Sequence, residues 1–180
     1  DLSSTSGNEP LYSDANDRAE FRGDTTVEFL KHTSWNFDLT EMTWVVVWEY
    51  SGTLSANKAV MGMVGASNIY IRSYLGTAND YKVQTRNSGL TTTDSLVVSD
   101  NTNKIIFVYR FNEASNQKIT SNEGGSEDST DDFSANSNNN TEFYIGVLPT
   151  NTGETFLSGY EAEAYLYEAM VYDNFISDSD

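Results

Sequence analysis

Short apolar segments in which every second side chain is large and hydrophobic recur along the chain. The clearest is 42–50, MTWVVVWEY, whose largest side chains share one face: Met42, Trp44, Val46, Trp48 and Tyr50. A repeat of two residues is the repeat of a β-strand. Because Val45 and Val47 make the opposite face apolar as well, the pattern predicts a strand whose middle is covered on both sides.

Two more long segments alternate in the same way. In 104–111, KIIFVYRF, one face carries Ile105, Phe107, Tyr109 and Phe111. In 162–172, AEAYLYEAMVY, one face carries Ala162, Ala164, Leu166, Met170 and Tyr172, interrupted by Glu168. Alanine, glutamate, leucine and methionine also favour helices. Three tyrosines, a valine and the lack of a capping residue favour a strand for this last segment.

Shorter apolar segments, separated by clusters of Gly, Asn, Asp, Ser and Thr, predict further strands at 19–21, 26–30, 59–64, 69–75, 82–86, 95–98 and 143–148. About ten strands at this spacing are typical of a sandwich or a jelly roll. We therefore predict an all-β fold, a two-sheet antiparallel β-sandwich. Residues 174–180 are expected to form a short helical turn or a tail.

One stretch departs from this pattern. From about 121 to 141 the chain carries many Asn, Ser, Asp and Glu residues and few apolar ones, which predicts a long surface loop. Calcium takes six to eight oxygen ligands, and Asp128, Asp131 and Asp132 are the candidate ligands here. The spacing does not match an EF-hand. The alternative is a solvated, mobile acidic loop that binds no metal.

Composition narrows the classes of function. The 180 residues correspond to a single domain spanning 1–180. With 10 basic and 27 acidic side chains the net charge is −17, which disfavours nucleic acid and anionic membranes as partners. No apolar run is long enough to cross a membrane as a helix. The absence of cysteine excludes disulfides and thiol chemistry, and a single histidine, His32, excludes a histidine-rich metal site.

Three pieces of the chain together resemble a known superfamily. The first, 1–30, DLSSTSGNEPLYSDANDRAEFRGDTTVEFL, has a Ser-Gly-Asn turn, then Pro-x-Tyr, then a strand that ends in Phe-x-Gly-Asp. The second is the hydrophobic strand 43–50. The third, 161–180, EAEAYLYEAMVYDNFISDSD, resembles a closing strand followed by Tyr-Asp and an Ile-Ser-Asp turn. These pieces are similar to the concanavalin A-like lectin/glucanase superfamily, in its laminin-G-like branch.

The resemblance implies a jelly roll of two antiparallel sheets, one of them concave. It also implies binding of glycan, protein or calcium at the sheet face or its rim. The superfamily includes enzymes, but this sequence lacks the Glu-x-Asp-x-x-Glu pattern of its glycosidases. Glu161 and Glu163 would share a face while Glu168 lies on the other, and His32 stands outside any lyase-like cluster. We therefore expect a protein that is not an enzyme.

The segment 72–87 is the best candidate for a binding site. Around a turn at 76–80 it combines planar and hydrogen-bonding side chains, the kind a sugar site requires: Arg72, Tyr74, Asn79, Asp80, Tyr81, Arg86 and Asn87. The alternative is an ordinary exposed hairpin. Trp44 and Trp48 are candidates for a platform on which a sugar ring stacks; the alternative is that they belong to the core. Arg22-Gly23-Asp24 has the sequence of an integrin-binding tripeptide; the alternative is an ordinary turn.

Taken together, these features predict a non-catalytic recognition or adhesion module. It would bind glycan or a surface protein through rim loops or the concave sheet, outside the cell, at a cell surface or on a virion. The alternative is a structural protein that self-associates in a larger assembly: a capsid decoration, a virion fibre or a surface layer. A glycan-degrading enzyme is the third hypothesis.

Overall fold

The computed structural model describes residues 3–5, 7–13, 15–22, 27–33, 41–50, 57–65, 69–76, 80–87, 90–97, 104–112, 116–121, 126–129, 140–172, 174 and 176. Its strands are β1 (Leu11–Ser13), β2 (Arg18–Arg22), β3 (Leu30–His32), β4 (Glu41–Tyr50), β5 (Lys58–Gly65), β6 (Ile69–Gly76), β7 (Asp80–Asn87), β8 (Leu90–Val97), β9 (Ile105–Asn112), β10 (Asn116–Ser121), β11 (Ser126–Ser129), β12 (Asn140–Ile145), β13 (Pro149–Asn151), β14 (Thr155–Phe156) and β15 (Glu163–Tyr172). Within these ranges no residue is helical, and none forms a helix that could cross a membrane.

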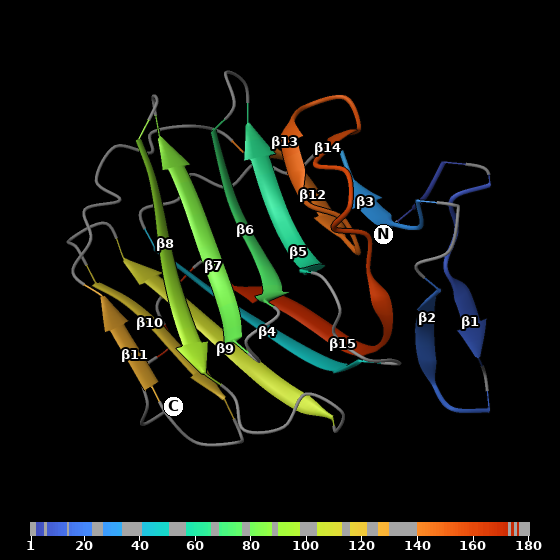
Figure 1. Ribbon diagram of the computed structural model, residues 1–180, viewed down its shortest axis with the longest axis horizontal. Coiled ribbons are helices and arrows are strands. Elements are labelled where there is room, and N and C mark those ends of the chain that lie inside the picture. Colours follow the sequence, from blue (N-terminus) through green and yellow to red (C-terminus); the bar gives the residue numbers. More distant parts are fainter. Residues whose placement is uncertain are drawn as a thin grey trace.

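Two large sheets face each other (Figure 1). The seven-stranded sheet has the order β1-β2-β15-β4-β9-β10-β11, and the six-stranded sheet has the order β3-β12-β5-β6-β7-β8. Neighbouring strands run antiparallel in both. The hairpin of β13 and β14 is a separate small sheet that lies beside β5. The predicted all-β, two-sheet antiparallel sandwich is confirmed.

The core fills the space between the two sheets. In β4 the alternating set that begins at Met42 and ends at Tyr50 points inward and is buried, so both tryptophans of this strand belong to the core. The ring of Tyr81 from β7 stacks on Phe107 from β9, with centroids 3.9 Å apart and planes 11° from parallel. Large aromatic rings that meet across the interface bury much apolar area, which holds the sheets together.

The alternation in β15 changes phase half-way along the strand. Ala164 and Leu166 point inward as expected, but a β-bulge follows Leu166 in the pairing with β4. A bulge inserts one extra residue and moves the next side chains to the opposite face. As a result Ala169 and Val171 pack against the core, and the prediction that Met170 and Tyr172 share the inner face is wrong. Tyr172 is an exposed side chain.

The outer face of β4 is covered in part, since Thr43 is buried there. Val46 is buried, but Val45 and Val47 on the outer face are only partly buried. Each lies beside an apolar neighbour on β9, since Val45 pairs with Val108 and Val47 with Ile106. Lateral contact within the sheet therefore accounts for the apolar outer face.

Two of the sequence predictions differ from the structure in detail, and the structure describes one residue of the integrin-like tripeptide. The acidic stretch contains the strand β11, which pairs with β10 in a position where a loop was expected. The strand predicted at 26–30 is shorter and later, since β3 begins at Leu30. Arg22, the first residue of the integrin-like tripeptide, donates through Nε to the buried carboxylate of Glu28, at 2.6 Å. Gly23 and Asp24 lie outside the described residues.

Candidate ligand-binding site

Strand alternation places a row of polar and aromatic side chains on the outer face of the six-stranded sheet. On β6 these are Tyr70, Arg72 and Tyr74, and on β7 they are Asp80, Lys82, Gln84 and Arg86. The pairing of the two strands sets Arg72 beside Gln84 and Tyr70 beside Arg86. Because side chains alternate along a strand, the intervening residues of both strands, Tyr81 among them, point into the core.

Arg72 is the centre of this arrangement. Its guanidinium donates through Nε to Gln84 Oε1 at 2.9 Å, through Nη2 to the same oxygen, and through Nη1 to the carbonyl oxygen of Pro149 at 3.2 Å. Its Cζ lies 4.0 Å from the centroid of the Tyr70 ring. A guanidinium has five N–H groups, so these three bonds leave one N–H on each Nη atom.

The charge of Arg72 is buried without a counter-ion among the residues that the structure describes. Only 7% of the residue is exposed, yet no carboxylate in the described part of the chain lies within ion-pair distance of it. Burial lowers the pKa of Arg72, and the neighbouring cation of Arg86 lowers it further. Buried charges are normally paired, because desolvation is costly. Arg72 and Arg86 are therefore neighbouring cations on one face of a chain whose net charge is −17.

A close approach between three elements shapes this site. Gly62 on β5 is paired with Arg72 on β6, and Pro149 of β13 lies directly over Gly62. A Cβ atom at Gly62 would lie 2.8 Å from the Cβ of Arg72 and 2.9 Å from the Cδ of Pro149. Glycine at this position therefore allows the hairpin to pack against the sheet and to offer its carbonyl oxygen to the guanidinium.

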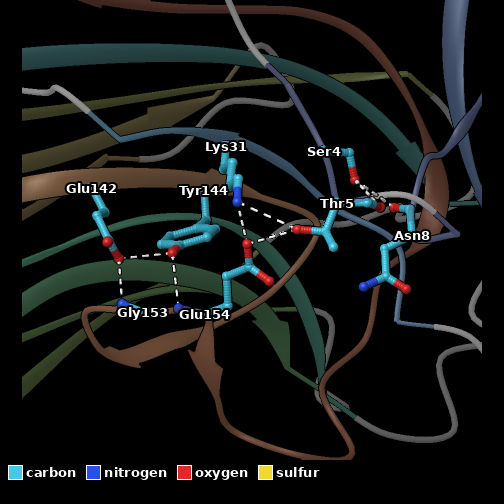
Figure 2. Close-up of polar contacts among 8 residues, drawn as sticks. All are labelled: Ser4, Thr5, Asn8, Lys31, Glu142, Tyr144, Gly153 and Glu154. Atoms are coloured by element: carbon cyan, nitrogen blue, oxygen red, sulfur yellow. Dashed lines mark hydrogen bonds and ion pairs between the residues drawn. The ribbon is translucent and has the colours of Figure 1, made fainter.

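The turn of the β13–β14 hairpin is anchored to the sheet by a polar network (Figure 2). Tyr144 donates its hydroxyl proton to Glu142 Oε2 at 2.7 Å and accepts the backbone N–H of Glu154 at 3.2 Å. The backbone N–H of Gly153 donates to the same carboxylate at 2.9 Å. Glu154 pairs with Lys31 and accepts from Thr5, and both contacts lower the pKa of its carboxyl group. The hairpin thus has a fixed position over the sheet.

The structure separates the seven residues that the sequence singled out. Arg72, Tyr74, Asp80 and Arg86 share the outer face, where Asp80 is held by Lys82 at 3.0 Å. Tyr81 is fully buried on the inner face, and burial raises the pKa of its hydroxyl. Asn79 lies outside the described residues, and only the backbone of Asn87 is described. That these residues bind a ligand stays a prediction.

Sequence reasoning missed Tyr70, Gln84, Gly62 and Pro149. The first two follow from alternation, because Tyr70 lies two residues before Arg72 and Gln84 lies two residues before Arg86. Gly62 and Pro149 carry no such signal, since their role depends on how the hairpin crosses the sheet.

The calcium prediction is untested. Asp128 belongs to β11, where its backbone pairs with Lys118, while Asp131 and Asp132 lie outside the described residues. In the portion of the chain that is described, no three His, Cys, Asp or Glu side chains gather as a metal site would require.

Comparison with known proteins gives matches by structure alone. No protein-family model matches the chain, and no curated protein sequence matches it. A SAP-like pentraxin from Limulus polyphemus matches 88% of this chain and 76% of its own, with 9% identity and a TM-score of 0.68. The CBM40 of a Ruminococcus gnavus IT-sialidase matches 91% and 93%, with 14% identity and a TM-score of 0.64. Mouse laminin α1 domains LG4-5 match 88% and 43%, with 11% identity and a TM-score of 0.62.

These neighbours share one jelly-roll architecture. The chain has the concanavalin A-like, laminin-G-like fold. At such low identity the likeness extends to the fold and no further, because one fold hosts many functions. What the site around Arg72 binds therefore follows from its own contacts and not from the concanavalin A-like fold.

Gly62→Ala is expected to disturb the site more than the fold. The added methyl group must displace Arg72 or Pro149, so the bond from Nη1 to the carbonyl oxygen of Pro149 should lengthen or break. We expect a loss of about 2 kcal/mol in the free energy of unfolding, measured with urea. Amide chemical shifts should change along β13 and β6. Unchanged shifts along β13 would contradict the described contact.

Proposed function

We propose that the chain is a non-catalytic module that binds acidic glycans on the outer face of the six-stranded sheet. The observation that carries this proposal is the buried guanidinium of Arg72, which has neutral hydrogen-bond partners and no carboxylate partner among the described residues. A sugar carboxylate would accept its two remaining N–H groups and supply the missing negative charge.

The surroundings of Arg72 suit a saccharide. Arg86 lies two residues after Gln84 on the outer face of β7 and is partly exposed, so its guanidinium can reach sugar hydroxyl groups. The ring of Tyr70 lies against the guanidinium, and Tyr74 is a second buried aromatic residue on the same face of β6. A site of this kind combines a few fixed polar groups with aromatic walls.

Two structural neighbours also support the proposal. The Ruminococcus gnavus CBM40 has been solved with α2,3-sialyllactose, a sugar that carries a carboxylate, and its fold matches 91% of this chain. A second neighbour is a binding domain, that of botulinum neurotoxin serotype G. A module that recognises glycans would act outside the cell or at a cell surface.

One of the two carboxylates that the sequence places on a shared face is engaged in an ion pair, which supports a non-catalytic role. Glu163 pairs with Lys58 at 3.5 Å. A retaining glycosidase needs two carboxyl groups at a separation of about 5–5.5 Å, free to act on one bond.

The proposal is tested by titrating the ¹⁵N-labelled protein with 3′-sialyllactose and, separately, with lactose. We expect saturable shifts along β6 and β7 with the acidic sugar, and an affinity for lactose that is at least about tenfold weaker. Because the attraction is ionic, binding should also weaken as salt rises. Equal affinities for the two sugars, or no binding of either, would overturn the proposal.

A further inference from the structure

A cavity that does not include Arg72 is lined in part by Phe156 of the β13–β14 hairpin. Pro149, whose carbonyl oxygen contacts Arg72, is paired across the hairpin with Phe156, which lines this cavity. The cavity has a volume of about 280 Å³, and Val27, Val147 and Leu157 form its other apolar walls. This volume lies at the lower end for ligand pockets and is enough for a single short chain.

The walls of this cavity are fixed by packing. Val147 is buried in a cluster with Phe29 and Tyr144. The ring of Phe156 lies 5.1 Å from each of those two aromatic rings, so it cannot turn into the cavity without breaking both contacts. The backbone of Leu157 is fixed by a hydrogen bond from its N–H to the carbonyl oxygen of Leu148, while the residue itself is 36% exposed. A preformed apolar cavity of this kind avoids the ordering cost of binding.

Two carboxylates line the same cavity, but only one of them carries an unbalanced charge. Glu154 is neutralised by Lys31. Glu161 accepts a backbone N–H from Gly159, and no lysine or arginine of the described ranges lies within ion-pair distance of it. The cavity therefore combines apolar walls with one net negative charge, in a strongly acidic chain.

We propose that this cavity binds an alkylammonium group, with the alkyl chain against Val147, Phe156 and Leu157 and the ammonium beside Glu161. The apolar walls remove the alkyl chain from water, and the carboxylate supplies the charge that the ammonium requires. The adjacent ring of Phe156 also favours a cation over a neutral group. This site has the opposite charge preference to the site at Arg72 and does not depend on the proposed function.

The probe is n-butylammonium, followed by the methyl resonances of Val147 and Leu157. We expect saturable shifts of these methyl groups, and about tenfold weaker binding of 1-butanol, a neutral molecule of the same size. Glu161→Gln should weaken n-butylammonium binding by a similar factor, while its amide oxygen can still accept from Gly159. The matched control is Glu168→Gln, which removes an exposed carboxylate outside this cavity and should leave the affinity unchanged.

A capped Gly-Lys-Gly peptide distinguishes the source of the amine. Binding tighter than that of n-butylammonium supports a lysine side chain of a protein partner, and equal binding supports a free amine. Equal affinities for n-butylammonium and 1-butanol, unchanged binding by Glu161→Gln, or no saturable methyl shift would each overturn the proposal. Since 3′-sialyllactose should shift β6 and β7 and leave these methyl groups unmoved, failure at one site is distinguishable from failure at the other.

Discussion

Replacing Arg72 with methionine is expected to lower the affinity for 3′-sialyllactose by at least about 100-fold. Methionine keeps an unbranched apolar stem beside Tyr70 but removes every N–H that a carboxylate would accept. It also removes a buried charge that has no counter-ion among the described residues, so the fold does not lose a compensated ion pair. Isothermal titration calorimetry measures the affinity, and the amide spectrum checks the fold.

Two companion variants make the Arg72 result decisive. Arg86→Met removes the neighbouring, partly exposed cation and should weaken binding by about tenfold, without touching the contacts to Gln84 and Pro149. Lys82→Met is the matched control, because Lys82 is a cation on the same strand whose charge is already balanced by Asp80. Its affinity should stay within about twofold of the wild type. If Arg72→Met binds as Lys82→Met does, the ligand does not contact Arg72.

Strand alternation in the sequence predicts which side chains of β6 and β7 face the candidate site. The segments IYIRSYLG and DYKVQTRN alternate strictly, and their outward sets are the residues that line the candidate site. Tyr81 and Asp80 are neighbours in the sequence, but neighbours in a strand point to opposite faces. The alternation therefore places Tyr81 in the core, away from Asp80.

Features that depend on pairing between distant segments could not be predicted. The bulge after Leu166 arises from the match between β15 and β4, so nothing in the sequence of β15 alone marks where its alternation changes phase. Likewise Gly62 and Pro149 are 87 residues apart in the sequence, and their contact exists because the hairpin crosses β5. The strong strands were predictable because their large aromatic residues have one stable location, the core.

Gly146→Ala is expected to destabilise the protein by about 4 kcal/mol, more than alanine at Gly62, Gly153 or Gly159. The backbone of Gly146 has φ +90°, a conformation that costs an alanine about 1–2 kcal/mol. The added Cβ would also lie 2.4 Å from Cε1 of Phe21 and 2.9 Å from the carbonyl oxygen of Glu28. Phe21 is fully buried, so its ring has no free space to enter.

The backbone around Gly146 cannot move away to relieve this contact. Its N–H donates to the carbonyl oxygen of Val60 at 2.9 Å, and its own carbonyl oxygen accepts the N–H of Ala162 at 3.0 Å. These bonds join the end of β12 to β5 and to the segment before β15, so a shift would strain both sheets at once. Urea unfolding at equilibrium measures the loss of stability.

Two other glycines separate the backbone cost from the steric cost. Gly153 and Gly159 also have positive φ, at +79° and +83°, but a Cβ at either position meets nothing within 4 Å. Alanine there should cost only the conformational penalty, about 1–2 kcal/mol. The difference between Gly146→Ala and these two variants then measures how tightly Phe21 and Glu28 enclose the chain at Gly146. A Gly146→Ala variant no less stable than Gly153→Ala would show that Phe21 does not pack against this turn.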